Sequence, residues 1–488
     1  MVYSSRLFLG LYFCILSLVV SAQQKKNSSK VNNWKQQAQQ DIEAHHGDYS
    51  AIALQIWDYA ELGYKEEKSS ALLQQTLKDK GFAVESGVAG IPTAFVASYG
   101  SGHPIIGILA EYDALPGLSQ QAIPEKATIA GRNAGHGCGH HLFGTASVAA
   151  GIELKKLIEQ NKWKGTIRVY GTPAEEGGSG KVYMVRAGLF NDADVVIHWH
   201  PASENFTKYD GALANKSAKF RFYGTSAHAS MSPEKGRSAL DGVEAMDNMV
   251  NMMREHIPSD ARMHYVITSG GKAPNVVPDF AEVYYYVRHP NREVVKQLFE
   301  RVTKAAQGAD MGTETRTDFE IIGGTYDLLL NNTLARVMQQ NLEEVGGVNY
   351  TPMELEFATK IQATFGFPPP PIENAGKVRP LVKPDVQALG STDVGDVSWT
   401  VPTVGVDAAT WVPGTPAHSW QAVASGGTQI GIKGMMVAAR AMALTAIDLF
   451  QDAELIQQAK AEFDKSRGSG FKYEPLLGDR KPALNYRD

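Results

Sequence analysis

The sequence predicts an α/β protein into which a second, smaller α+β domain is inserted. The chain has 488 residues, which exceeds the size at which one hydrophobic core usually stops growing. Strand patterns alternate with helical patterns up to about residue 200, and this order is typical of a sheet with parallel strands. Near Leu213 the order changes to β-α-β-β-α-β, which is typical of a ferredoxin-like domain.

The first part of the α/β domain is expected over residues 31–212. A helical pattern runs from Trp34 to about Lys80 and ends at Gly81. The carboxyl ends of the strands that follow are where open α/β sheets place ligands. The expected strands are 93–99, 104–109, 166–170 and 195–197, and the expected helices are 142–158 and 182–190.

The inserted domain is expected over residues 213–326, and the α/β domain then resumes over 327–488. The FPPPP run at 367–371 indicates a loop or an insertion within this second part. In the insert the expected strands are 218–223, 264–268, 282–288 and 318–322, and the expected helices are 238–256 and 294–306. Two more helices are expected, at 333–345 and 427–449.

Composition and the first residues limit the class of protein. Hydrophobic residues make up 43% and charged residues 20% of the chain, as in soluble globular proteins. The formal net charge is -5, so no basic excess suggests a nucleic-acid partner. Residues 1–22 have the form of a signal peptide, with Arg6, an apolar run and the small-residue site Val20-Ser21-Ala22. The run is short for a membrane span, so we expect a periplasmic or secreted protein with no membrane contact.

Export makes the cysteine count informative. The chain has two cysteines, and Cys14 lies in the leader, so the mature chain would carry Cys138 alone into an oxidising compartment. Cys138 lies in GHGCGHH (135–141), together with three histidines. Thiolate and imidazole are preferred ligands of zinc-like ions. The motif therefore predicts a metal site, and its alternative is a polar turn around a buried cysteine.

A second cluster, TPAEEGG (172–178), follows the strand at 166–170. Adjacent carboxylates in a glycine-rich turn point in different directions. One of Glu175 and Glu176 can therefore bind a metal while the other takes a proton from an activated water. The alternative is a solvated acidic turn that opens a helix, where glutamate is electrostatically favourable.

Two further clusters supply histidines. His198 and His200 follow the strand at 195–197, and residues two apart on a regular strand share a face, so one can be a ligand and the other its neighbour. His418 lies in GTPAHSW (414–420) before the last helix. Either cluster alone could be a core or a surface histidine. All four clusters in a chain with 13 histidines indicate a metal centre.

The order of these motifs resembles the aminoacylase and carboxypeptidase-G metallopeptidases, in particular their amidohydrolase branch. The similarity covers nearly the whole mature chain, and within the branch it is greatest to the aminobenzoyl-glutamate hydrolase subgroup. Long strings of this kind are more specific than one short motif. The strings are AELGYKEEKSS, LAEYDALPG, HGCGHHLFGT, TPAEEGG, GTSAHAS, GGKAPNVVPD, STDVGDVSW and GTPAHSWQ.

The resemblance implies a central mixed sheet with flanking helices, two divalent metal ions (Zn or Mn), and an insert that serves as a dimerisation and lid domain. Glu175 matches the general base, and Asp113 matches an acidic position near the metals. In the family a metal-binding histidine follows an Asp and an apolar strand. Counting forward from Asp194 in this pattern selects His200 as that ligand, whereas counting back from Pro201 selects His198. We prefer His200, because it lies at the very end of the strand. The matched metal ligands are Cys138, His140, Glu176, His200 and His418.

The insert also carries matched residues. His228 matches a histidine that the insert presents to the active site of a partner subunit, where it can donate to a developing oxyanion. Asn275 and Arg288 match positions that bind the carboxylate or amide of the substrate. Without the resemblance, His228 is a turn histidine and Arg288 can be a structural ion-pair residue. The expected assembly is a homodimer, or alternatively a pair with a homologous second subunit.

The sequence thus predicts a metal-dependent amidohydrolase that splits the amide bond of a small N-acyl or N-aroyl amino acid of the p-aminobenzoyl-glutamate kind. A metallo-dipeptidase or carboxypeptidase with the same site is the alternative. A non-catalytic metal-binding protein is a further one, but it would have no need of Glu175 beside Glu176. Two departures favour the aminobenzoyl-glutamate subgroup. His141 stands where the branch more commonly has Asp, and Ser391-Thr392-Asp393-Val394 replaces its Ser-Glu-Asp-Phe element.

Overall fold

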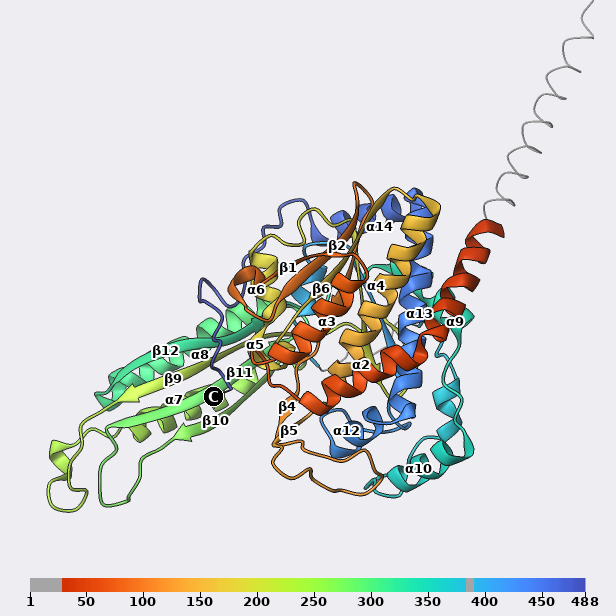
Figure 1. Cartoon of the computed structure of the whole chain (residues 1–488). Coiled ribbons are helices and arrows are strands. Elements are labelled where there is room, and N and C mark those ends of the chain that lie inside the picture. The colour runs from red at the N-terminus through yellow and green to blue at the C-terminus, as the bar shows by residue number, and fades with distance from the viewer. Residues whose placement is uncertain (1–28, 383–389, 488) are drawn as a thin grey trace, which may run out of the picture.

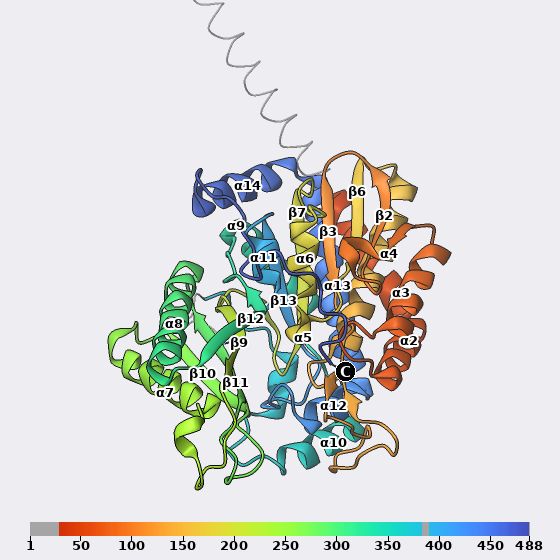
Figure 2. The ribbon, with the colours of Figure 1, turned by 90° about the vertical axis from the view of Figure 1, so that its left-hand side faces the viewer.

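The computed structural model describes residues 29–382 and 390–487, so the predicted leader lies outside the described residues. Figures 1 and 2 show a larger α/β body from which residues 214–325 project to one side as an arm. The cavity discussed below lies where the arm meets the body.

A seven-stranded mixed sheet forms the centre of the body. Its four middle strands, β6, β3, β7 and β13, run parallel, and the outer strands β1, β2 and β8 pair antiparallel with their neighbours. This confirms the predicted α/β class with a central mixed sheet. In sheet order the strands are β1 (Ala83–Ser86), β2 (Phe95–Ser101), β6 (Gly165–Gly171), β3 (Ile105–Ala110), β7 (Val195–Ala202), β13 (Thr403–Ala409) and β8 (Phe206–Lys208).

Helices cover both faces of this sheet, and β3 and β13 are therefore buried along their whole lengths. The long helix α13 is apolar enough to cross a membrane, but 89% of its apolar stretch is buried inside the protein, where it packs against α4. A Cβ added to Gly434 of α13 would lie 2.4 Å from the Ala409 carbonyl oxygen, so glycine lets this helix approach the end of β13. The larger helices of the body are α2 (His46–Tyr59), α3 (Glu67–Asp79), α4 (His140–Asn161), α9 (Asn332–Val345), α10 (Pro352–Gln362), α13 (Gln429–Gln451) and α14 (Ala453–Arg467).

Short elements near the strand ends carry most of the site. The strands β4 and β5 pair with each other beside the GHGCGHH motif. These elements are β4 (Leu115–Pro116), β5 (Ala134–Gly135), α5 (Glu175–Gly178), α6 (Gly180–Arg186), α11 (Val394–Ser398) and α12 (Trp420–Gly426).

Two expectations about the body were wrong. The helix expected over 34–80 breaks into residues 29–44, α2 and α3, because Ala60 and Tyr64 adopt positive φ of 44° and 65° in the turn between α2 and α3. The strand expected to end at residue 197 continues to Ala202, so His198 and His200 lie within β7. Its parallel partner β13, which pairs with β7 from Val196 to Ala202, was not predicted.

The arm contains a four-stranded antiparallel sheet in the order β10-β11-β9-β12. Its chain order, β9-α7-β10-β11-α8-β12, is the expected β-α-β-β-α-β. The two helices bury alternate side chains of one sheet face, such as Phe220, Phe222 and Val283, and leave a polar face opposite. The elements are β9 (Ala214–Tyr223), α7 (Ala239–Met253), β10 (Arg262–Ser269), β11 (Phe280–His289), α8 (Arg292–Thr313) and β12 (Arg316–Thr325).

Candidate metal centre and active site

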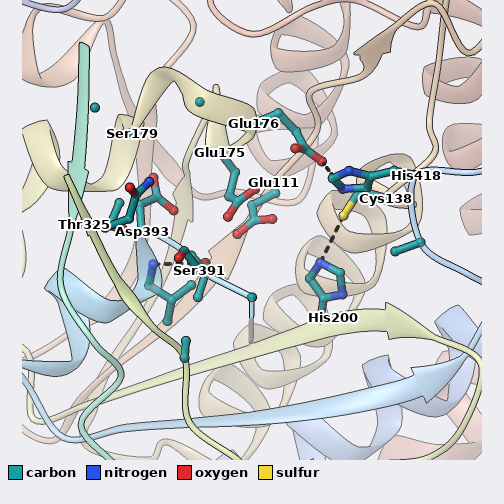
Figure 3. A pocket seen from close by; sticks show the side chains of 18 of the residues that line it. Glu111, Cys138, Glu175, Glu176, Ser179, His200, Thr325, Ser391, Asp393 and His418 are labelled. Carbon is teal, nitrogen blue, oxygen red and sulfur yellow. Dashed lines mark hydrogen bonds and ion pairs between the residues drawn. The ribbon is translucent and has the colours of Figure 1, made fainter. Parts of the chain in front are cut away.

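A cavity of about 620 Å³ lies between the carboxyl ends of the central strands and the base of the arm's sheet. This is the edge at which open α/β sheets place ligands. Figure 3 shows Cys138, His200, Glu176 and His418 on one side, Ser391, Asp393 and Thr325 on the other, and Glu111 and Glu175 between them. The lining therefore brings together segments that lie far apart in the sequence.

Cys138 lies at the centre of the donor atoms. Its sulfur is 3.4 Å from Nε2 of His200, and ligand atoms of Cys138, His140 and His200 all lie within 4.8 Å of one another. A second group within the same limit contains Cys138, Glu176 and His418, with His418 Nε2 at 3.1 Å from Glu176 Oε1. One sulfur thus belongs to two adjacent groups of potential metal ligands.

Hydrogen bonds on the far side of the rings orient two of the histidines. Nδ1 of His140 lies 2.8 Å from Asp113 Oδ1, and Nδ1 of His200 lies 2.7 Å from the Pro201 carbonyl oxygen. Donation from Nδ1 leaves Nε2 of each ring free as a ligand, the arrangement commonly found for metal-binding histidines. The other Asp113 oxygen accepts from the Glu176 amide at 2.9 Å, so one carboxylate fixes parts of both groups.

The donor atoms fit a metal ion. Oε2 of Glu111, Nε2 of His140 and Oε1 of Glu176 are buried and form no hydrogen bond of ordinary geometry, although Glu111 Oε2 lies 3.1 Å from His140 Nε2 and Glu176 Oε1 lies 3.1 Å from His418 Nε2. Buried polar atoms normally have a hydrogen-bond partner, and an ion between these atoms would take the place of that partner. Burial, with Glu176 nearby, raises the pKa of the Cys138 thiol well above its usual value, so ion binding would have to displace the thiol proton. Thiolate, imidazole and carboxylate together suit a zinc-like divalent ion.

Glu175 lies beside these groups without belonging to either Cys138-centred one. It lines the cavity and forms a third cluster with Glu111 and His140. Burial, followed by repulsion from Glu111 and Glu176, raises the pKa of Glu175 well above its usual value. A raised pKa makes a carboxylate a stronger base, which suits it to accept a proton.

The turn that carries Glu175 is held by a buried carboxylate. Ala174 adopts a left-handed φ of 57°, and its amide donates to Glu66 Oε1 at 2.8 Å. Glu66 also accepts from the Thr93 hydroxyl at 3.0 Å. Such a conformation persists only where its surroundings fix it, so Glu66 helps to aim the Glu175–Glu176 pair at the cavity. Glu66 lies in the motif AELGYKEEKSS, but this role was not predicted from the motif.

A buried cation behind the cavity was missed altogether. Nζ of Lys181 lies 2.7 Å from both Glu111 Oε1 and Asp393 Oδ1, and the Lys181 amide donates to Asp393 Oδ2 at 2.9 Å. The side chain is fully buried, where a charge is costly unless it is paired. The available signal was a lysine in the otherwise small and apolar segment GSGKVYMV (178–185).

The remaining histidines of the motifs have other surroundings. His198 lines the cavity but joins no ligand group, and its ring packs against Gly405, where an added Cβ would lie 2.3 Å from Nε2. His136 and His141 contact the Ile56 and Gly426 carbonyl oxygens at 3.1 and 3.0 Å. Both stabilise the fold of the GHGCGHH loop. Of the two strand histidines, the structure therefore places His200 with the ligands.

The three residues of the insert that were predicted to act in the site do not all lie at the cavity. Arg288 lines the cavity. His228 and Asn275 lie on exposed loops of the arm, where the Ala229 amide donates to the Asn275 carbonyl oxygen at 3.0 Å. Neither lines the cavity of its own chain.

Comparisons with known proteins agree with the geometry. A sequence model of peptidase family M20/M25/M40 matches residues 107–372. One of the subunits of the p-aminobenzoyl-glutamate hydrolase of Escherichia coli (strain K12) is 42% identical over 86% of this chain and 93% of that protein. The Xaa-Arg dipeptidase of Mus musculus is 28% identical over 85% of this chain and 88% of that protein. A solved dinuclear metal binding peptidase of the M20 family from Bacillus subtilis has a TM-score of 0.57 at 17% identity, with 84% of this chain and 99% of that one covered. The resemblance stated from the motifs is confirmed.

Proposed function

The chain belongs to peptidase family M20/M25/M40 and is a metal-dependent hydrolase of amide bonds, and we propose that it cleaves N-acyl or N-aroyl amino acids of the p-aminobenzoyl-glutamate kind. One observation carries the proposal. Glu175 faces the cavity beside two groups of metal ligands that share Cys138. A site that only bound metal would not need this additional carboxylate. The 42% identity to a protein named as part of a p-aminobenzoyl-glutamate hydrolase supports the substrate class.

We propose that two divalent ions, Zn or Mn, occupy the two groups. Cys138 would be shared, with His140 and His200 on one side and Glu176 and His418 on the other. Bound there, the ions would lower the pKa of a water molecule and polarise the carbonyl of the amide.

The protein's own groups move the proton. The Glu175 carboxylate accepts a proton from the attacking water and delivers it to the departing nitrogen, as a general base and then a general acid. The raised pKa of Glu175 makes its carboxylate a stronger base toward the water proton. Asp113 and Glu66 keep the turn in place through the amides of Glu176 and Ala174.

Substitution of Glu175 by glutamine tests this function. With Zn or Mn added, the wild-type chain should hydrolyse p-aminobenzoyl-glutamate, and E175Q should lose about 100- to 10,000-fold in kcat while its metal content stays unchanged. The same change at the exposed Glu373 is the matched control. Normal activity of E175Q would remove Glu175 from this role. Faster cleavage of dipeptides than of aroyl amino acids would favour the metallo-dipeptidase alternative.

We also propose that the active form is a homodimer, or a pair with a homologous second subunit. The support is the placement of His228 and Asn275, which are exposed on the arm and outside the cavity of their own chain. In such a pair the partner subunit's His228 would donate a hydrogen bond to the developing oxyanion. Size-exclusion chromatography with light scattering measures the assembly, and a monomer with full activity would contradict it.

Export is proposed from the leader pattern. Cleavage after Ala22 would leave Gln23 as the first residue. Amino-terminal sequencing of the protein from a periplasmic fraction or from the medium tests this. Recovery of the intact leader on cytoplasmic protein would contradict it.

A further inference from the structure

The segment after α14 connects the arm to the active site. The hydroxyl of Tyr326, which directly follows β12, donates to the Glu474 carbonyl oxygen at 2.6 Å, and Arg480 donates to the Ile322 carbonyl oxygen of β12 at 2.8 Å. From the body, Arg186 donates to the Gly478 carbonyl oxygen at 2.9 Å. Figures 1 and 2 show the segment in dark blue as it runs from α14 to the label C beside the site. Residues 468–487 are thus held in a defined course.

This segment places a guanidinium in the cavity. The Arg487 Nη2 donates to the Glu176 carbonyl oxygen at 2.6 Å, and the Tyr486 hydroxyl donates to the same oxygen at 3.0 Å. The Tyr486 ring packs edge-on against Tyr64, with ring centroids 5.5 Å apart. Arg487 lines the cavity, and its Nε is buried without a hydrogen-bond partner. Of its five N–H groups, several therefore remain available to a ligand.

Another part of the cavity lining comes from the polar face of the arm's sheet. Arg288 of β11 pairs with Asn215 of β9, which pairs in turn with Thr325 of β12. Directly paired residues share a face, and all three line the cavity. Arg288 Nε, Asn215 Oδ1 and Thr325 Oγ1 are buried without a hydrogen-bond partner. Several aligned polar atoms without partners indicate a surface that binds a polar ligand.

The charges on this surface indicate the ligand. Across residues 29–382 and 390–487, neither Arg288 nor Arg487 forms an ion pair. A planar guanidinium matches a carboxylate in two parallel hydrogen bonds. Two such groups line one cavity with the proposed catalytic carboxylate Glu175, so a substrate bound there can present one carboxylate to each.

We propose that Arg487 and Arg288 bind the two carboxylates of one substrate, so that the chain selects N-acyl derivatives of dicarboxylic amino acids. In this arrangement Arg487 binds the side-chain carboxylate. This inference rests on the proposed function and specifies its substrate class. A substrate with a neutral amide in place of that carboxylate would leave the half-buried guanidinium of Arg487 without a charged partner, and polar groups of a site that lose their partner discriminate between substrates.

A pair of isosteric substrates tests the role of Arg487. N-benzoyl-glutamate and N-benzoyl-glutamine differ only in the side-chain carboxylate. For R487Q we expect kcat/KM on the glutamate derivative to fall about 10- to 100-fold, mainly through KM, and kcat/KM on the glutamine derivative to change less than about 3-fold. R487K should lie between R487Q and the wild type, because an ammonium keeps the charge but not the fork.

Two control variants separate charge recognition from positioning. Y486F removes the other hydrogen bond to the Glu176 carbonyl oxygen without changing charge, so it should affect both substrates equally. K472Q removes an exposed cation from the same segment outside the cavity and should change neither rate. Equal losses on both substrates in R487Q would show that Arg487 acts only through Glu176 and would overturn the proposal, as would no loss on either.

Calorimetric titration of the full chain with N-benzoyl-glutamate keeps the two proposals distinguishable. Binding that weakens in R487Q but not in K472Q would support Arg487 as a carboxylate ligand even if the wild-type chain cleaved neither compound. That result would contradict the proposed function alone. Equal affinity of the wild type and R487Q for the glutamate derivative would contradict the inference alone.

Discussion

Replacement of Lys181 by methionine should destabilise the protein, because this lysine is the buried counter-ion of two carboxylates behind the active site. Its ammonium lies 2.7 Å from both Glu111 and Asp393. Although burial disfavours the ammonium, Asp393 and Glu111 raise the pKa of Lys181 above its usual value, so it stays charged. Methionine is similar in length and apolar, so the change removes the charge and leaves little empty volume.

The magnitude follows from what the substitution leaves behind. Breaking a buried ion pair by removal of one partner typically costs about 3–5 kcal/mol, because the other charge stays buried and uncompensated. Two carboxyl groups lose their counter-ion here, but burial already raises the pKa of both Glu111 and Asp393, and protonation would limit the cost. We therefore expect about 3–5 kcal/mol in total. For a chain of this size, with an unfolding entropy of about 2.1 cal/mol/K per residue, that corresponds to a melting temperature lower by roughly 3–5 °C.

Differential scanning calorimetry of the metal-free protein measures this shift. The double variant K181M/D393N removes one of the stranded carboxylates and should recover part of the loss. K360M, which removes a cation from the exposed pair of Lys360 and Glu356, is the matched control and should not shift the melting temperature measurably. A shift below about 2 °C in K181M would refute the reasoning, since it would mean that the carboxyl groups are neutral without the lysine.

The remaining predictions concern the metal, the assembly and the pH dependence. C138S should bind at most one ion per chain, because Cys138 is shared by both ligand groups; two ions per chain by elemental analysis would contradict the sharing. H228A and E175Q should each be inactive alone but give about a quarter of wild-type activity when co-expressed, since half of randomly paired dimers are mixed and each keeps one intact site. No recovery would exclude donation of His228 between subunits. Burial raises the pKa of Glu153 to about 8, so the folded chain keeps a proton that the unfolded chain releases. Stability should fall by up to about 1.4 kcal/mol per pH unit between about pH 5 and 8. E153Q should melt higher than the wild type at pH 8 but not at pH 5, and an equal difference at both values would contradict this.

The central sheet could be predicted where the chain alternates buried strands with helices. The runs that became β3 and β6 are apolar and bounded by turn residues, so their period and length identified them. β13 has the sequence TVGVDAA, in which glycine, alanine and an aspartate dilute the strand pattern. It is a strand because β7 pairs with it along its length and α13 covers it, and a contact between residues so distant in sequence leaves no local signal.

The contrast between a local sequence pattern and a contact between distant residues also separates the parts of the site that could be predicted from those that could not. Cysteine, histidine and paired glutamates are rare enough together that Cys138, His140, Glu175 and Glu176 were identifiable by residue type. Residues two apart on a strand share a face, so the sequence could not show whether His198 or His200 is the ligand, and both do line the cavity. The contact of His200 with Cys138 is visible only in the folded structure.

Arg487 and Lys181 show why residue type alone is insufficient for cations. Surface lysines and arginines are common in any globular chain, so neither residue differs from its neighbours until the fold places it at the site. Lys181 becomes significant because the carboxyl end of β3 places Glu111 against it, and Arg487 because a segment held by the arm ends at Glu176. The two cations also act on different quantities. Substitution of Lys181 should lower the stability of the protein and should not distinguish between substrates. Substitution of Arg487 should instead alter the ratio of kcat/KM for the glutamate and glutamine derivatives and leave stability nearly unchanged. A melting shift in R487Q as large as that in K181M would therefore place Arg487 among the structural residues of the site.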